Sequence, residues 1–123
     1  MGKIYTFEII GETPAKKNSR INLRNGISIP SKRYTQWHST ALSQLLEQSR
    51  PPEPIDYPVL IHLKFTHGDL RRRDSDNGCS SILDLLTDAK VLKDDKWQIV
   101  RDLAICNDYE KGHPKCSITI QEI

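Results

Sequence analysis

The alternating segment at residues 57–67 most constrains what this chain can fold into. Within YPVLIHLKFTH, apolar side chains at positions 59, 61, 63 and 65 alternate with a second set that includes His62 and Lys64. A period of two is typical of a β-strand with one buried face and one less buried face. The chain therefore contains at least one half-buried strand, and the remaining sequence indicates what accompanies it.

A strand and a turn are indicated near the start of the chain. Residues 3–11, KIYTFEIIG, are rich in β-branched and aromatic side chains and predict a first strand that ends at Gly11. The polar and basic stretch that follows contains Asn25-Gly26, a dipeptide typical of tight turns. Residues 23–28 are therefore expected to form a short hairpin or an ordered loop.

Two helices are expected. Ser31 can cap the first, from about Lys32 to Ser49, and the following prolines end it because proline has no backbone N–H. The second is expected from roughly Ser75 to Lys90. The expected apolar faces are Trp37, Ala41, Leu42, Leu45 and Leu46 in the first helix, and Cys79, Ile82, Leu85, Leu86 and Ala89 in the second. The opposite face of the second helix holds Asp76, Ser80, Asp84 and Thr87.

Residues 96–106 and 115–123 read as two further strands. The order strand, hairpin or loop, helix, strand, helix, strand, strand predicts an α/β (α+β) fold with a mixed β-sheet and two main helices. At 123 residues the chain is expected to be a single small domain over residues 1–123.

Bulk composition narrows the class of protein. Hydrophobic residues make up 37% and charged residues 28%, as in ordinary globular proteins. No apolar run approaches the roughly 20 residues that span a bilayer, and the start of the chain does not resemble a signal peptide, so a cytoplasmic location without membrane contact is expected. The three cysteines, without CxxC spacing, are expected to be reduced thiols.

Charge is distributed unevenly along the chain. The net charge is only +2, but residues 13–46 contain no acidic residue. The cations of that region are Lys16, Lys17, Arg20, Arg24, Lys32 and Arg33. Most acidic residues follow in the second half, from Asp74 onward. The asymmetry indicates either a basic surface for a polyanion or a solvated basic loop without a partner.

Opposite charges meet in RRRDSDNGCSSILDLLTDAKVLKDD, residues 71–95. Asp74 and Asp76 directly follow three arginines, and Asp94-Asp95 comes about a helix length later. A carboxylate at the start of a helix can be an N-cap, favoured by free backbone N–H groups and by the helix dipole. That interpretation explains Asp74 or Asp76 alone, but it explains neither the pair nor the second pair.

Convergent carboxylates are also what a hard divalent cation such as Mg²⁺ requires. Such an ion can polarise a phosphoryl oxygen and activate a bound water. Arg71, Arg72 and Arg73 would then hold the phosphodiester that the carboxylates repel. The residues themselves leave both interpretations open, a capped helix and a metal site beside a phosphate.

Other chemistries find little support. The four histidines, His38, His62, His67 and His113, lack ligand-like spacing and are expected to be solvent-facing or hydrogen-bonded, the last two in loops. No glycine-rich phosphate loop or nucleophile elbow is present, so no small-molecule cofactor is expected. Trp37 and Trp97 are expected to be core or interface anchors.

Residues 71–103, RRRDSDNGCSSILDLLTDAKVLKDDKWQIVRDL, resemble the signature of RusA-type Holliday junction resolvases. The family's Asp-x-Asp-Asn, its following helix and its Asp-Asp turn fit here from Asp74 to Asp95 without a gap. PAKKNSR and PSKRYTQW, near the start, are more loosely similar to the family's N-terminal pattern. The resemblance implies a homodimeric endonuclease that cuts four-way DNA with Mg²⁺ (Mn²⁺ as an alternative), and it suggests a phage-derived gene.

By this resemblance Asp74, Asp76 and Asp95 match the essential metal-binding acidic residues, Asp94 an adjacent acidic position and Asn77 the asparagine after the motif. One position departs from the pattern, because a lysine implicated in catalysis is Ser80 here. Lys17, Lys93 and Lys96 are the candidates for a replacing cation. The full set expected to bind substrate is Lys16, Lys17, Arg20, Arg24, Lys32, Arg33, Arg71, Arg72, Arg73, Asn77, Lys93 and Lys96.

The favoured hypothesis is Mg²⁺-dependent, paired hydrolysis of DNA phosphodiesters in recombination and repair, with Arg72 or Arg73 positioning the backbone. Two alternatives stay open. In one, the chain binds branched DNA but has lost turnover, as the missing lysine permits. In the other, the acidic residues cap a helix and a turn, and the basic loop contacts a protein.

Overall fold

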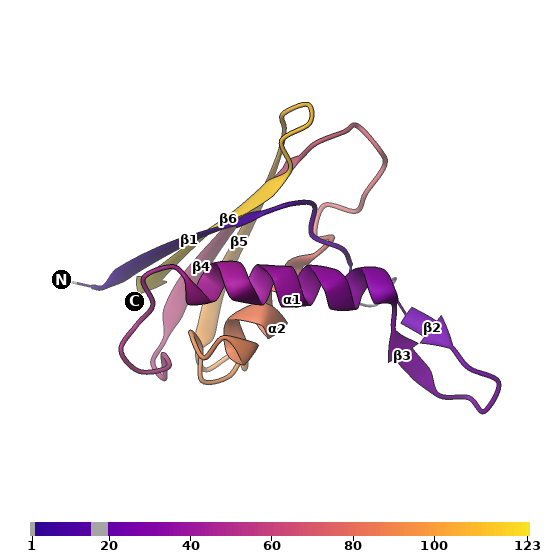
Figure 1. Ribbon diagram of the computed structural model, residues 1–123. Helices are drawn as coiled ribbons and strands as arrows, with labels where there is room; N and C mark the ends of the chain where they lie inside the picture. The colour runs from indigo at the N-terminus through magenta and orange to yellow at the C-terminus, as the bar shows by residue number, and fades with distance from the viewer. Residues whose placement is uncertain (1, 16–19) are drawn as a thin grey trace.

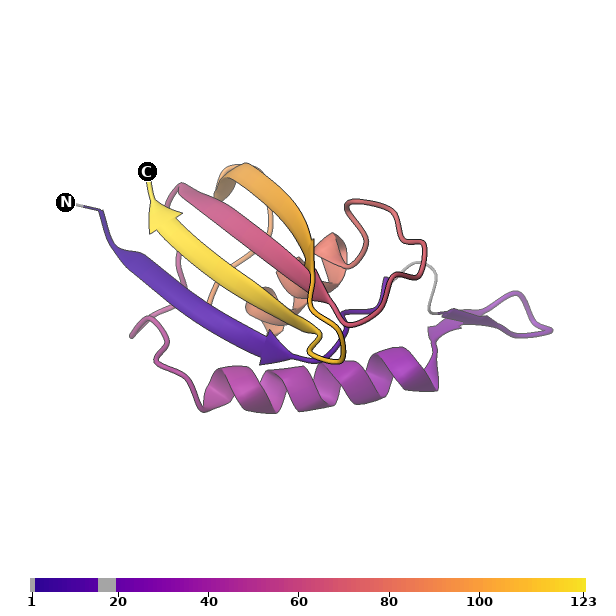
Figure 2. The same ribbon diagram turned by 90° about the horizontal axis from the view of Figure 1, so that it is seen from above.

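A four-stranded mixed sheet with both helices on one face forms the body of the protein (Figures 1 and 2). The computed structural model describes residues 2–15 and 20–123. The strands of the sheet are β1 (Ile4–Ile10), β4 (Val59–His67), β5 (Val100–Tyr109) and β6 (Lys115–Glu122). Their order is β1-β6-β4-β5, with β4 and β5 parallel and the other neighbours antiparallel. The expected α/β fold with a mixed sheet and two main helices is confirmed.

The core lies between the sheet and the helices. Val59, Ile61, Leu63 and Phe65 of β4 are all buried, which confirms the period of two read from the sequence. The neighbouring β6 places Ile118 opposite Leu63 and Ile120 opposite Ile61, so both strands direct their apolar side chains into one cluster. Burying an aliphatic side chain of this size stabilises the fold by about 1.5–3 kcal/mol.

Helix α1 (Lys32–Leu46) begins where the sequence predicts. The Ser31 hydroxyl accepts a hydrogen bond of 3.2 Å from the backbone N–H of Tyr34, an N-cap interaction. The helix ends three residues before the predicted Ser49, because the Glu47 N–H bonds to the Gln44 carbonyl in a tighter final turn. Ala41 and Leu45 are buried as expected, but Leu46 is 50% exposed, so its place on the apolar face was wrong.

Two glutamines, Gln44 in α1 and Gln48 just after it, cover the β1 edge of the sheet. The Gln48 side chain accepts from the Glu8 N–H at 2.9 Å and donates to the Glu8 carbonyl at 2.8 Å. Gln44 makes the same pair of contacts with Ile10, at 2.8 and 3.4 Å. These amides act as a substitute neighbouring strand, since a bare edge exposes unpaired backbone groups. The opposite edge, β5, has no such cover among the described residues.

The expected hairpin near the start of the chain is confirmed. Strands β2 (Arg20–Asn22) and β3 (Ser28–Pro30) pair antiparallel, and the Leu23 N–H donates to the Ile27 carbonyl at 2.8 Å across the turn. The hairpin extends away from the sheet beyond the start of α1 (Figures 1 and 2). It carries Arg24 on its exposed turn.

Helix α2 (Cys79–Asp88) is shorter at both ends than the expected range of 75–90. Its apolar face is as predicted, with Ile82, Leu85 and Leu86 fully buried. Of the helices in the part of the chain that the structure describes, none combines the length and the apolar composition needed to cross a membrane.

Three further expectations need correction. Strand β5 begins at Val100 instead of Lys96, because residues 97–99 form a turn. Trp97 lies in that turn and is 68% exposed, so it is not a core residue, whereas Trp37 packs against the core. His67 was expected in a loop and is the last residue of β4.

Candidate metal and phosphate site

The segment between β4 and α2 carries the Asp-Ser-Asp motif, and a glycine shapes it. Gly78 precedes the first residue of α2 and has a left-handed backbone with φ of 86°. A Cβ at this position would lie 2.8 Å from Thr13 Cγ2, so a side chain has neither a favourable backbone nor room. Because of this break, residues 75–78 form a turn and the helix starts only at Cys79.

The turn leaves Asp74 and Asp76 outside the helix. Gly78, the N-cap residue, provides no side-chain cap, and the Asp76 carbonyl accepts from the Cys79 N–H at 3.1 Å. The N-cap interpretation of the two aspartates is therefore wrong. Both side chains are exposed, and neither has a hydrogen-bonding or ion-pairing partner among the described residues. Carboxylates without a structural role of this kind are available to a ligand.

A second acidic group surrounds Asp95, in the turn before β5. Its backbone N–H donates to Asp94 Oδ1 at 2.8 Å. The pKa of Asp95 is raised, first by partial burial, then by the hydrogen bond with the Asp94 side chain and by the negative charges of Asp84 and Asp94. Asp95 therefore sits in an environment that disfavours its own charge, and a bound cation would relieve that repulsion.

Asp84 lies near enough to Asp95 for its charge to raise the pKa of Asp95, a proximity that the sequence did not reveal. The sequence places Asp84 on the polar face of α2, one turn after Ser80, but gives no sign that the segment before β5 comes close to it. Cys79, the first residue of α2, has a thiol pKa that is raised by burial and by the nearby charge of Asp76. Asp84 lies five residues further along the helix, which corresponds to a rise of roughly 7.5 Å. This rise is the approximate separation, along α2, of the acidic group that contains Asp76 and the one that contains Asp95.

Within residues 2–15 and 20–123, no three His, Cys, Asp or Glu side chains converge in a way that could hold a metal ion. A single site built from Asp74, Asp76 and Asp95 therefore stays a prediction. The donors nevertheless suit Mg²⁺, which binds oxygen and is commonly held by only one or two protein carboxylates while keeping several waters. The exposed Asp74 and Asp76 and the mutually repelling Asp94 and Asp95 each provide such a pair.

An arginine-lined pocket adjoins the Asp-Ser-Asp turn. It has a volume of about 180 Å³ and lies between the segment after β1 and the arginines that precede Asp74. Its lining residues are Glu12, Thr13, Pro14, Ala15, Arg33, Arg71, Arg72, Arg73 and Asn77. The Thr13 hydroxyl is buried there without a hydrogen-bonding partner among the described residues. With four arginines and one glutamate among its lining residues, the pocket has an excess of positive charge, which favours an anion.

The arginines of this pocket are not equivalent. Arg73 is only 12% exposed in its side chain and pairs with Glu12 at 3.1 Å and with Asp69 at 2.9 Å. Arg71 pairs more loosely with Asp69, at 3.4 Å. Arg72 and Arg33 have no ion pair with any residue that the structure describes. The part of the pocket open to a phosphate is therefore set by Arg72 and Arg33.

Of the remaining predicted substrate-binding cations, those whose side chains the structure describes do not line this pocket. Lys32, at the start of α1, and Arg24, on the hairpin, are exposed, and Arg20 begins β2. Lys16 and Lys17 lie outside the described residues. Of the lysines considered in place of the one absent at Ser80, Lys93 pairs with Asp56 at 3.2 Å, whereas Lys96 is exposed beside Asp95. Ser80 itself is exposed on the first turn of α2.

Comparison with known proteins identifies the family of this chain. The chain is similar to the "Crossover junction endodeoxyribonuclease RusA" of Aquifex aeolicus (strain VF5), with 27% identity over 113 residues that cover 91% of this chain and 87% of the relative. The model of the family described as endodeoxyribonuclease RusA matches residues 11–121. That range includes the segment after β1, both acidic groups, and strands β4, β5 and nearly all of β6, while β1 lies before it. The chain therefore belongs to the RusA family of endodeoxyribonucleases.

Proposed function

We propose that this chain resolves Holliday junctions and related branched DNA in recombination and repair by Mg²⁺-dependent hydrolysis of phosphodiesters. The observation that carries the proposal is the pair of exposed, unpartnered carboxylates, Asp74 and Asp76, beside a pocket with the uncommitted Arg72 and Arg33. The relative from Aquifex aeolicus bears the name of a crossover junction enzyme, which supports branched DNA as the substrate. A single nuclease domain and a cytoplasmic location, both expected from the sequence, belong to this proposal.

In this proposal the acidic residues bind the metal ion and the basic residues bind the DNA backbone. Asp74 and Asp76, together with Asp95, would hold Mg²⁺ or Mn²⁺, which when bound supplies a Lewis acid and lowers the pKa of a coordinated water. Arg72 and Arg33 bind a backbone phosphate next to the carboxylates and offset their repulsion of DNA. Asn77 lines the same pocket and can donate to a phosphate oxygen. The exposed Arg24 and Lys32, together with Arg20, Lys16 and Lys17, extend contacts along the backbone.

Lys96 is the cation that we assign to the role of the absent family lysine. It directly follows Asp95, is exposed and has no ion pair among the described residues. Lys93, by contrast, is held by Asp56. Paired cuts across a junction require two active sites, so a homodimer with two-fold symmetry is also part of the proposal.

A second candidate is a branched-DNA-binding protein of the same fold without turnover. Ser80 favours it, because an uncharged hydroxyl replaces the family lysine and cannot stabilise negative charge in the transition state as an ammonium does.

A junction-cleavage assay separates the candidates. A labelled four-way junction and a linear duplex are incubated with wild-type protein, with Asp76→Asn and with Asp88→Asn, in Mg²⁺ or in EDTA. Asp88 is a matched control, since it is an exposed aspartate at the end of α2 that pairs with His38, at 2.8 Å. Nicking that needs Mg²⁺, is lost in Asp76→Asn and is kept in Asp88→Asn supports the nuclease. Tight junction binding without nicking supports the second candidate, and no affinity for DNA at moderate salt rejects both in favour of a protein partner.

A further inference from the structure

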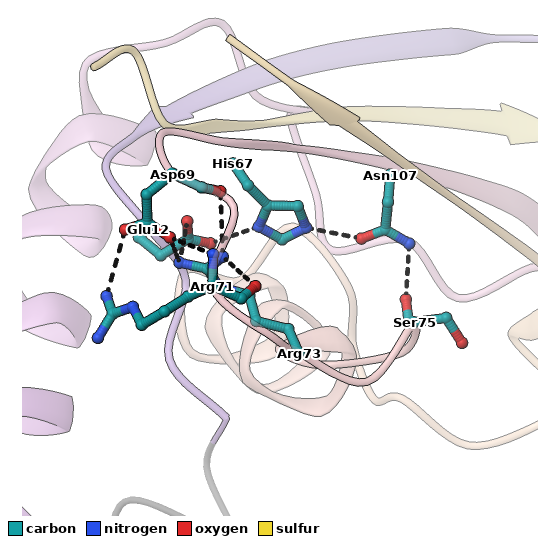
Figure 3. A network of polar contacts seen from close by, with 7 residues as sticks. All are labelled: Glu12, His67, Asp69, Arg71, Arg73, Ser75 and Asn107. Atoms are coloured by element: carbon teal, nitrogen blue, oxygen red, sulfur yellow. Dashed lines mark hydrogen bonds and ion pairs between the residues drawn. The ribbon is translucent and has the colours of Figure 1, made fainter. Parts of the chain in front are cut away.

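A chain of polar contacts ties the loop before α2 to three other segments (Figure 3). We call Glu12, His67, Arg73 and Asn107 the anchor network. His67, at the end of β4, lies between the other members: its Nδ1 is 2.8 Å from Glu12 Oε2, and its Nε2 is 2.8 Å from Asn107 Oδ1. Glu12 pairs in turn with Arg73 at 3.1 Å. The network thus joins the segment after β1, the end of β4, strand β5 and the loop.

The network holds the loop at the two residues that flank Asp74. On one side, Arg73 is bound through its side chain to Glu12. On the other, Asn107 Nδ2 donates to the Ser75 carbonyl at 2.8 Å, and Ser75 is also the residue between Asp74 and Asp76. Asp74 therefore lies between two residues that are held from the segment after β1 and from β5, and Asp76 directly follows the second of them. The two carboxylates themselves have no hydrogen-bonding or ion-pairing partner among the described residues.

The hydrogen bonds determine the orientation of each group. Since Asn107 Nδ2 faces the Ser75 carbonyl, Asn107 Oδ1 must face His67 and accept from Nε2. Nδ1 faces the Glu12 carboxylate and must donate as well. Both ring nitrogens of His67 therefore face oxygen atoms, and the Glu12 carboxylate lies between the His67 ring and the Arg73 guanidinium.

Burial makes these contacts stronger than ordinary surface pairs. The side chains of Arg73, His67 and Glu12 are 12%, 13% and 18% exposed, respectively, so water screens the ion pair between Arg73 and Glu12 only weakly. Arg73 also donates to the Asp69 carboxylate and to the Arg71 carbonyl, which closes the loop on itself. Because these partners occupy the Arg73 guanidinium, it is not available to bind DNA.

We propose that the anchor network positions the metal-binding turn: Glu12, His67 and Asn107 hold Arg73 and Ser75, and thereby fix Asp74 and Asp76 for cation binding. Arg73 belongs to this network instead of the phosphate-binding set. The inference rests on the proposed function, because it takes Asp74 and Asp76 as ligands. Hydrogen-bonded partners behind metal ligands commonly change metal affinity by about 10- to 100-fold when they are removed.

The test uses Asn107→Leu, which removes both amide hydrogen bonds from an exposed position of β5 where a leucine suits the strand. Gln121→Leu is the matched control, an amide-to-leucine change on an exposed position of β6. Gln121 pairs with Leu60 near the start of β4, at the opposite end of that strand from His67. Mn²⁺ binding to the DNA-free protein is measured by electron paramagnetic resonance, and amide hydrogen exchange is measured over residues 68–78.

In Asn107→Leu we expect roughly tenfold weaker Mn²⁺ binding and faster exchange in the loop, at the low end of the range for such partners. Junction binding in EDTA and the melting temperature should match those of Gln121→Leu, which separates positioning from general destabilisation. Glu12→Gln, an isosteric change between His67 and Arg73, should reproduce the weaker Mn²⁺ binding.

If amide hydrogen exchange over residues 68–78 is unchanged in Asn107→Leu, the inference is overturned, whatever Mn²⁺ affinity is measured. Wild-type Mn²⁺ affinity in Asn107→Leu, while Asp74→Asn abolishes it, would overturn the inference alone and leave the proposed function intact. Unchanged Mn²⁺ affinity in Asp74→Asn would reject the proposed metal site, and with it the positioning role of the network.

Discussion

Gly78→Ala tests whether the turn that carries the two aspartates is set by contact with the segment after β1. Two costs are expected. A left-handed backbone, with φ of 86° here, costs an alanine about 1–2 kcal/mol. The new Cβ would also lie 2.8 Å from Thr13 Cγ2 and 3.4 Å from Phe65 Cε1, and overpacking of a filled site costs about 1–3 kcal/mol. The free energy of unfolding should therefore fall by about 2–5 kcal/mol.

Gly112→Ala separates the two costs. Gly112 has a similar φ of 74°, but nothing lies within 4 Å of a Cβ built there, so only the backbone cost of about 1–2 kcal/mol remains. Urea unfolding of both variants, compared at equal m-values, gives the steric part as the difference. Thr13→Ser, which removes Cγ2, should restore most of that difference in the Gly78→Ala background.

The reasoning is refuted if the two glycine variants lose the same stability within about 0.5 kcal/mol, the size of a neutral surface change. It is also refuted if Thr13→Ser restores nothing, because the close contact would then not be the source of the steric cost.

Two further outcomes are expected at neighbouring positions. Since the pKa of Asp95 is raised in the folded protein, its protonated form favours folding at pH values below its unfolded pKa, near 3.8, and this contribution is lost as the pH rises through the folded value. Asp95→Asn should therefore raise the melting temperature of the metal-free protein at pH 7 but not at pH 3, and an equal shift at both pH values would contradict the assigned repulsion. Arg72→Ala should weaken junction binding in EDTA and reduce the slope of log K against log salt by about one, the contribution of one phosphate contact; a slope equal to that of the wild type would show that Arg72 does not contact the backbone.

The local features of this fold could be predicted from the sequence alone. The alternation at residues 57–67 identifies β4, Asn25-Gly26 the turn of the hairpin, and Ser31 the start of α1. Each depends on the conformational preferences or the periodicity of residues close together in the chain. The Asp-x-Asp-Asn motif likewise identified the family, because its spacing is itself a local property of the sequence.

The tertiary structure alone decided where α2 begins. The apolar face of α2 begins at Cys79, and the preceding residues, RRRDSDNG, contain no apolar side chain whose period would fix where the helix starts. The helix starts at Cys79 because Gly78 adopts a left-handed conformation against Thr13, a residue far away in the chain. Because the helix starts at Cys79, neither Asp74 nor Asp76 is its N-cap.

The roles of the charged side chains were also decided by tertiary contacts. The three consecutive arginines are indistinguishable in the sequence, yet Arg73 is bound to Glu12 while Arg72 stays open to a ligand. Asp84 similarly became a neighbour of Asp95 only because the turn before β5 folds back along α2. A sequence specifies which residues carry charge and which local conformations they favour. Which charges neutralise each other depends on approaches between distant segments, because Coulomb interactions act through space and weaken with distance and water.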